Sequence, residues 1–274
     1  MQPQPSLELR NVSKTFLAKS NAPIQAIANV DLAIQPGEFV TLVGPSGCGK
    51  STLFNILAGL HDADADGEIS FEGRQGRGRD LLGKVAFMPQ RDLLLPWRRI
   101  IDNVILPLEI EGKTKRQARA EAVGLFGEFG LDGFERHYPH QLSGGMRQRV
   151  ALMRTFMFKR SLMLLDEPFG ALDALTRMLM QRWLLEVWEN HNRTILFITH
   201  DVDEAIFLGD RVLVMSSRPG TIKMSKPVPL ERPRTSAMLT APEFLHIKEE
   251  LLAAIEEESL KSFKFEMAAR KSRV

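Results

Sequence analysis

The fold of this chain is decided by one stretch, Gly44-Pro45-Ser46-Gly47-Cys48-Gly49-Lys50-Ser51, which fits the pattern G-x-x-x-x-G-K-[ST] at every position. An apolar, β-rich run over 38–43 precedes the stretch, and a helix-like run over 51–58 follows it. This strand–loop–helix context is typical of a phosphate-binding loop, because glycines let backbone N–H groups turn toward a polyphosphate and the helix N-terminus adds partial positive charge. The context favours such a loop over a glycine-rich turn that holds no ligand.

Three side chains of this loop have chemistry of their own. Lys50 can reach the β- and γ-phosphates of a nucleotide, and the Ser51 hydroxyl can ligate Mg²⁺. Cys48 is the only cysteine of the chain, which excludes an internal disulfide and fits a reducing cytosol. We interpret Cys48 as filling a variable loop position rather than as a redox switch, because no second cysteine could resolve an oxidised thiol.

Composition narrows the class of protein. The 274 residues include 36 Lys and Arg against 34 Asp and Glu, a net charge of +2, which argues against nucleic-acid binding through global charge. Met1–Pro5 lacks the basic and apolar regions of a signal peptide. No apolar run approaches the roughly 18 residues that indicate a membrane span. We therefore expect a protein that is soluble or is held at a membrane by a partner.

Four further motifs follow the loop in a fixed order. They are Leu142-Ser143-Gly144-Gly145-Met146, the pair Asp166-Glu167 after an apolar strand, Ala171-Leu172-Asp173, and Ile198-Thr199-His200-Asp201. With the phosphate loop, this order resembles the nucleotide-binding subunit of ATP-binding cassette (ABC) transporters: Walker A, signature motif, Walker B, D-loop and switch histidine. The resemblance covers about residues 6–220, and five motifs in order make it specific.

The apolar runs predict the architecture. Strand-like runs at 162–165, 194–198 and 211–215 alternate with helical patterns, which indicates a parallel sheet covered on both faces. Residues 98–158 are rich in helix formers. The resemblance implies an α/β fold of the phosphate-loop (RecA-like) kind: a mainly parallel sheet core, an antiparallel β subdomain and an inserted helical subdomain.

The resemblance also implies a domain organisation. The ABC ATPase domain spans 1–226, with its helical subdomain at about 91–158. Residues 227–274 are then a proline-marked linker and a C-terminal helical extension, with a helix predicted over 243–260. An acidic cluster, which includes Glu257 and Glu258, lies on this helix, and a basic stretch from Lys261 follows. We interpret that last stretch as a solvated, frayed terminus rather than a membrane-surface segment.

ATP and Mg²⁺ are the cofactors that the resemblance implies. Asp166 would hold Mg²⁺, Glu167 would polarise the attacking water as general base, and His200 would contact the γ-phosphate. Gln90 matches the family's Q-loop glutamine, which reaches the metal and the water. Phe16 matches the aromatic residue that stacks on adenine, although a buried strand phenylalanine is the alternative. The implied nucleotide contacts are Phe16, Gly44, Pro45, Ser46, Gly47, Cys48, Gly49, Lys50, Ser51, Thr52, Ser143, Gly144 and Gly145, and the implied metal ligands are Ser51, Gln90 and Asp166.

The signature motif predicts a homodimer. Ser143, Gly144 and Gly145 precede a helix, so their N–H groups form an anion site. In the family this site faces the γ-phosphate bound by the other subunit. One loop and one signature motif per chain therefore imply two chains around two ATP. The fifth signature position is Met146 where the general pattern has Gln, and methionine cannot donate an amide hydrogen bond.

Three segments point to a subfamily. Leu93-Leu94-Leu95-Pro96-Trp97, the extension of Walker B to Arg177, and Ser217-Arg218-Pro219-Gly220 resemble the nitrate/sulfonate/taurine importer subfamily. This resemblance implies a separate transmembrane permease, an external solute-binding protein, a peripheral position on the cytoplasmic face of the cell (inner) membrane, and no nucleic-acid partner. The segment Gln90–Trp97, which contains this apolar stretch, would form part of a groove that receives a short permease helix. The alternative is that these residues pack the base of the helical region.

Other functions stay open at this point. The same role for a pyrimidine, riboflavin or thiamine-precursor importer is one alternative. A soluble, non-transport ABC ATPase is another, although such chains usually carry two cassettes or a long coiled-coil insertion. A phosphate-loop kinase or GTPase of another family is disfavoured by the signature motif and by the absence of an Asn-Lys-x-Asp motif.

Overall fold

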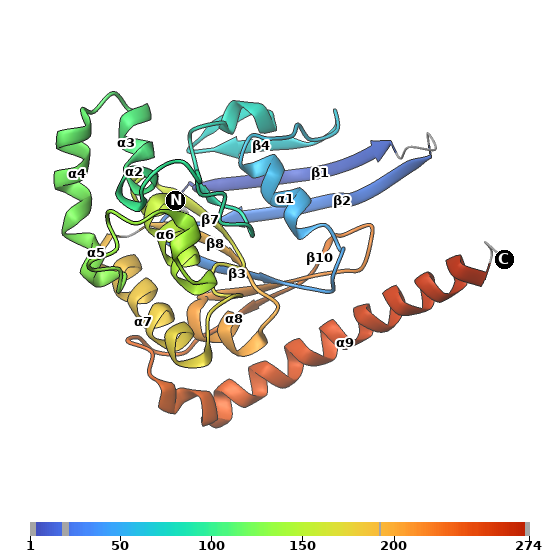
Figure 1. The fold of residues 1–274 in the computed structure, drawn as a ribbon. Coiled ribbons are helices and arrows are strands. Elements are labelled where there is room, and N and C mark those ends of the chain that lie inside the picture. The colour runs from blue at the N-terminus through green and yellow to red at the C-terminus, as the bar shows by residue number, and fades with distance from the viewer. Residues whose placement is uncertain (1–3, 18–21, 192, 272–274) are drawn as a thin grey trace. The chain divides into compact units, whose positions relative to one another are not determined.

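The structure is a computed structural model that describes residues 4–17, 22–191 and 193–271. The chain divides into two compact units: residues 1–83 with 194–274, and residues 84–193 (Figure 1). The second unit is therefore inserted, in sequence, between the two halves of the first.

The first unit contains an antiparallel sheet in the order β2-β1-β4-β5. Its strands are β1 (Leu7–Leu17), β2 (Pro23–Ile34), β4 (Glu68–Phe71) and β5 (Arg74–Gly76). Leu7 of β1 stands opposite Ile34 on one side and Phe71 on the other, and all three side chains are buried. This sheet confirms the predicted antiparallel β subdomain.

The first unit also contains mainly parallel strands. β3 (Phe39–Val43) pairs in parallel with β8 (Thr194–Ile198) and with β9 (Arg211–Met215), while β10 (Ile222–Pro227) is antiparallel to β9. Every residue of β3 and β8 is buried, as expected for near-continuous apolar strands covered on both faces. Because parallel strands end at one edge, the loops after β3, β8 and β9 meet there.

The helices of the first unit are α1 (Lys50–Leu57), α8 (Val202–Leu208) and α9 (Pro242–Lys271), with short 3₁₀ turns at Gly78–Leu81 and Ser236–Thr240. α8 packs on β3, and α9, drawn in red in Figure 1, contacts both α8 and β9. α9 extends beyond the predicted end at residue 260.

The second unit combines a parallel strand pair with helices. β6 (Ala86–Met88) pairs with β7 (Leu162–Asp166). The helices are α2 (Ile100–Val104), α3 (Leu106–Ile110), α4 (Lys115–Val123), α5 (Leu125–Glu128), α6 (Gly144–Phe156) and α7 (Ala174–His191), with a 3₁₀ turn at Pro139–Gln141. α6 packs on α2 and β6. The ring centres of Phe129 and Trp183 lie 4.0 Å apart. None of the described helices in either unit is long and apolar enough to cross a membrane.

Arg234 is a buried cation that secures the end of α8. Its guanidinium donates to the carbonyl oxygens of Ile206 (2.6 Å), Phe207 (3.1 Å) and Gly209 (2.7 Å). Burial lowers the pKa of Arg234 to about 10. The charge is tolerated in this buried position because helix C-terminal carbonyls carry partial negative charge.

We expect Arg234→Met to lower the free energy of unfolding by about 2–4 kcal/mol, because it leaves several buried carbonyl groups without a donor. Urea unfolding followed by circular dichroism measures this loss. Arg10→Met is the matched control, because Arg10 is exposed and its ion pair with Glu8 lies at the surface. Equal unfolding midpoints for the two variants would contradict the assigned role.

Candidate functional site

The phosphate loop leaves β3 and enters α1 at Lys50, as predicted. Gly49 has φ +111°, and a Cβ atom there would lie 2.5 Å from Ile27 Cγ2 and 2.8 Å from the Ala26 carbonyl oxygen. Only glycine fits both this backbone conformation and this close approach. The loop backbone therefore lies against β2 as the chain enters α1.

Lys50 is the single cation of the loop, and its ammonium group is bonded to carbonyl groups of the same loop. Lys50 Nζ donates to the carbonyl oxygens of Gly44 (2.8 Å) and Pro45 (3.0 Å). Ser46 and Ser51 are exposed, whereas Cys48 is buried with only 1% of its surface exposed. Backbone amides, a helix N-terminus, an ammonium group and an exposed hydroxyl form a donor set that fits a polyphosphate.

The predicted switch histidine, His200, follows β8 at the same sheet edge as the phosphate loop. Leu42 of β3 is in register with Ile198 of β8, and Thr199 N donates to the Leu42 carbonyl oxygen at 3.3 Å. His200 follows and is exposed. Asp201 then caps α8 by accepting from Asp203 N and Glu204 N. These bonds fix the backbone on both sides of His200.

Phe16 lies near the end of β1 and is half-buried. Lys14 Nζ lies 5.6 Å from its ring centre, and His61 packs edge-to-face against it at 5.7 Å. The ring is thus neither a core phenylalanine nor a fully exposed one. Adenine stacking by Phe16 stays a prediction.

In the second unit, the predicted catalytic carboxylate and amide are in contact. Asp166 is buried at the end of β7, and Gln90 Nε2 donates to Glu167 Oε2 at 3.1 Å. Glu167 has φ +49°, a conformation that non-glycine residues rarely adopt and that clusters at functional sites. The backbone thus turns Glu167 away from the strand and toward Gln90.

The signature motif begins α6. Ser143 is the N-cap residue, and its hydroxyl accepts from Met146 N at 3.2 Å. Ser143 and Gly144 are exposed, and a Cβ atom on Gly145 would lie 3.0 Å from Leu172 Cδ2. The N-terminus of α6 is therefore accessible at Ser143 and Gly144, whereas Gly145 packs closely against Leu172.

The segment 92–97 is held from two sides, by residues that we did not predict from the sequence. Arg154 donates to the carbonyl oxygens of Asp92 (2.6 Å) and Leu93 (2.8 Å). The fully buried Asn103 accepts from Leu95 N (2.7 Å) and donates to the Leu95 carbonyl oxygen (3.1 Å). The apolar side chains on this segment are consequently presented on an anchored backbone.

Comparison with known proteins gives the family. The sequence model described as ABC transporter matches residues 27–170. The chain is 39% identical to the formylaminopyrimidine import ATP-binding protein ThiZ of Halalkalibacterium halodurans, over 90% of this chain and 96% of that protein. It is 43% identical to the aliphatic sulfonates import ATP-binding protein SsuB of Bacillus thuringiensis subsp. konkukian, over 79% of this chain and 84% of that protein.

A solved structure has the same fold. It is the dimeric, post-hydrolysis structure of the ATP-binding cassette MJ0796 bound to ADP and Pi, with a TM-score of 0.74 and 30% identity over 82% of this chain and 100% of that one. This chain belongs to the ATP-binding proteins of the ABC transporter family. Its α/β fold is that of the ABC cassettes, and its enzymatic class is ATPase.

Proposed function

We propose that the chain is the ATP-hydrolysing subunit of an importer, which dimerises around two ATP to drive uptake of a small solute through a separate permease. The observation that carries this proposal is the identity of about 40% with import ATP-binding proteins over most of the chain. A peripheral position on the cytoplasmic face of the inner membrane follows from the same reasoning.

The first unit would bind the nucleotide. The backbone N–H groups of Gly44 and of Ser46–Thr52, with the ammonium group of Lys50, would hold the β- and γ-phosphates, and Phe16 would stack on the adenine. His200 would donate to the γ-phosphate from the same sheet edge. This arrangement uses preorganised donors, which stabilise charge without reorganising during the reaction.

The second unit would activate the water. Glu167 would accept a proton from the attacking water, and Gln90 would orient both the carboxylate and the water. Ser51, Asp166 and Gln90 would hold Mg²⁺. Such an ion neutralises negative charge on the phosphates.

The homodimer would complete each site. Each chain has one phosphate loop and one exposed signature helix N-terminus, at Ser143–Gly145. In the dimer, the signature amides of one chain would meet the γ-phosphate bound by its partner. We further propose that 1–226 form the ATPase domain, with the helical subdomain at about 91–158, and that 227–274 form the linker and C-terminal extension.

The permease would dock on the segment 93–97. Leu93 and Trp97 are 58% and 72% exposed, although Leu94, which we expected in the same groove, is only 8% exposed and belongs to the core. The difference arises because Leu93 has φ +44° and the backbone of this segment is held by Arg154 and Asn103, so that neighbouring side chains point in different directions. Exposed Trp residues commonly anchor interfaces, so Trp97 is the better probe.

Trp97→Asp should leave the ATPase activity of the isolated subunit unchanged but abolish its co-purification with the permease and its support of uptake. Val123→Asp on α4 is the matched control, since it places the same charge on another exposed apolar position. Normal co-purification and normal uptake with Trp97→Asp would place the groove elsewhere. Full ATPase activity with no permease attached to the wild-type chain would favour a soluble, non-transport role.

The solute would be a sulfonate-, taurine- or nitrate-like anion, with a pyrimidine, riboflavin or thiamine precursor as the alternative. The similarity to SsuB supports the first and the similarity to ThiZ the second. An external solute-binding protein and the permease would select between them. The same uptake assay, run with labelled taurine and with a labelled aminopyrimidine, decides between the two classes.

A further inference from the structure

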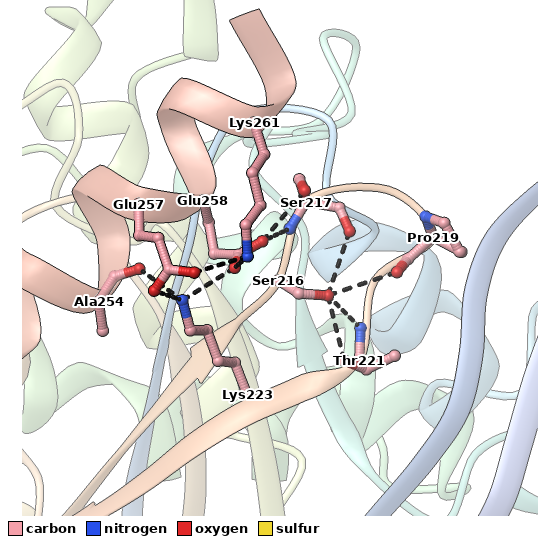
Figure 2. Close-up of polar contacts among 9 residues, drawn as sticks. All are labelled: Ser216, Ser217, Pro219, Thr221, Lys223, Ala254, Glu257, Glu258 and Lys261. Atoms are coloured by element: carbon pink, nitrogen blue, oxygen red, sulfur yellow. Dashed lines mark hydrogen bonds and ion pairs between the residues drawn. The ribbon is translucent and has the colours of Figure 1, made fainter. Parts of the chain in front are cut away.

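The loop between β9 and β10, residues 216–221, connects the phosphate loop with the C-terminal helix α9. Figure 2 shows its polar contacts on the α9 side and within the loop itself. The loop is braced internally, because Ser216 Oγ accepts from Thr221 N at 2.9 Å and Ser216 N donates to the Thr221 carbonyl oxygen at 2.9 Å. It can therefore transmit a displacement from one side to the other.

On one side the loop is packed against the phosphate loop. Arg218 Nε and Nη2 both donate to the Gly47 carbonyl oxygen, at 3.2 and 3.0 Å. Gly220 exchanges backbone hydrogen bonds with β2, to the Ala26 carbonyl oxygen and from Ala28 N, each at 3.0 Å. A Cβ atom on Gly220 would lie only 2.0 Å from the Cys48 carbonyl oxygen. A shift of this loop must therefore shift the backbone at 47–48 as well.

On the other side the loop is bonded to Glu258 of α9. One oxygen of this carboxylate accepts from Ser217 N (2.9 Å) and Ser217 Oγ (3.1 Å), and the other accepts from Lys223 (2.9 Å) and Lys261 (2.8 Å). These four donors match the acceptor capacity of an ionised carboxylate. Burial alone would raise the pKa of Glu258, but the bonds from Lys261, Lys223 and Ser217 lower it to about 2. The group is therefore charged at neutral pH, and its bond to Ser217 N is charge-assisted.

The preceding residue provides an internal comparison. Glu257 contacts the same two lysines, Lys223 at 2.5 Å and Lys261 at 2.7 Å. Its side chain is 56% exposed, whereas that of Glu258 is 4% exposed. In the described structure only Glu258 of the two is bonded to the loop. The two glutamates therefore differ in the link to Ser217 rather than in their ion pairs.

We propose that Glu258 is a positioning residue for nucleotide binding, through which α9 holds loop 216–221, and with it Gly47 and Cys48, in the shape that receives phosphates. This proposal rests on the proposed binding of ATP at Gly44–Thr52. A preformed loop binds more tightly because less ordering is required at the moment of binding. The C-terminal extension thereby has a function in the ATPase site although it lies outside the matched region 27–170.

The first test measures nucleotide affinity in full-length variants. Glu258→Ala should weaken binding of a non-hydrolysable ATP analogue by roughly tenfold, the effect of losing one charge-assisted hydrogen bond. Glu257→Ala should bind like the wild type. Calorimetry is run at a temperature at which circular dichroism shows every variant fully folded. Under this condition an unfolded fraction cannot lower the apparent affinity.

The second test uses Cys48 and needs no nucleotide. This thiol is the only one in the chain, and it is buried although it belongs to the phosphate loop itself. Its rate of reaction with a maleimide under native conditions therefore reports how often the loop opens. The rate should rise about tenfold in Glu258→Ala and stay at the wild-type value in Glu257→Ala. Glu258→Gln, which keeps an oxygen that can accept from Ser217, should label more slowly than Glu258→Ala.

A variant at the other end of the link protects the test against misfolding. Arg218 is exposed, so Arg218→Ala should fold normally. It should also speed the labelling of Cys48 and weaken the binding of the ATP analogue. If Glu258→Ala and Glu257→Ala label and bind alike, or if Glu258→Ala lowers only the melting temperature, the positioning role is wrong. Failure of the wild type itself to bind the analogue would instead overturn the proposed function, while the labelling rates would still measure the link.

Discussion

Glu167→Gln should lower the rate of ATP hydrolysis about 10²–10⁴-fold while ATP binding is retained, because the change removes a general base and keeps the shape of the side chain. The glutamine can still contact Gln90, which donates to Glu167 at 3.1 Å in the structure. The phosphate loop is untouched. Steady-state phosphate release and equilibrium binding of ATP measure the two quantities separately.

A matched variant identifies effects of the amide substitution alone. Glu128→Gln makes the same change on an exposed residue at the end of α5 and should hydrolyse ATP at the wild-type rate. A Glu167→Gln protein that hydrolyses ATP normally would remove Glu167 from the mechanism. In that case its contact with Gln90 would be structural.

Lys50→Ala should weaken ATP binding about tenfold or more, since a charge-assisted contact contributes roughly 1.5–3 kcal/mol. The side chain is the only cation within the loop, and it also bridges the carbonyl groups of Gly44 and Pro45. The substitution therefore removes both a phosphate donor and a brace of the loop. Calorimetry with a non-hydrolysable analogue measures the loss.

The control for this change is Lys84→Ala, which removes an exposed lysine outside the phosphate loop. Its affinity for the analogue should equal that of the wild type. If Lys50→Ala also binds with unchanged affinity, the stretch Gly44–Ser51 is not the phosphate site.

Local pattern predicted the elements that position the site. The apolar runs at 162–165, 194–198 and 211–215 are the strands β7, β8 and β9, and the phosphate loop lies between β3 and α1. Such runs are informative because a strand buried on both faces must be apolar at nearly every position. The family resemblance then gave each motif its expected role.

Buried polar residues could not be predicted, because their partners are distant in the sequence. Glu258 is one of several glutamates on α9, and its hydrogen bonds from Ser217, 41 residues earlier in the chain, distinguish it from Glu257. Arg234 bonds to carbonyl groups 25 or more residues away. Composition and periodicity report exposure along one element, whereas these contacts depend on how separate elements pack.

The same limit applies to the apolar stretch 93–97. Its composition indicated an exposed patch, yet Leu94 is buried while Leu93 and Trp97 are exposed. Leu93 has φ +44°, an unusual conformation for a leucine that periodicity does not predict. The direction of each side chain is set by the bonds from Arg154 and Asn103 to the backbone of this segment.

The most direct test of the central claim is the mass of the Glu167→Gln protein by sedimentation, with and without ATP. One chain has a mass of 30.9 kDa. With ATP the account predicts a species of twice that mass that retains two ATP, because each bound nucleotide needs the signature motif of the other chain. A species that binds ATP fully and stays at the mass of one chain would contradict it.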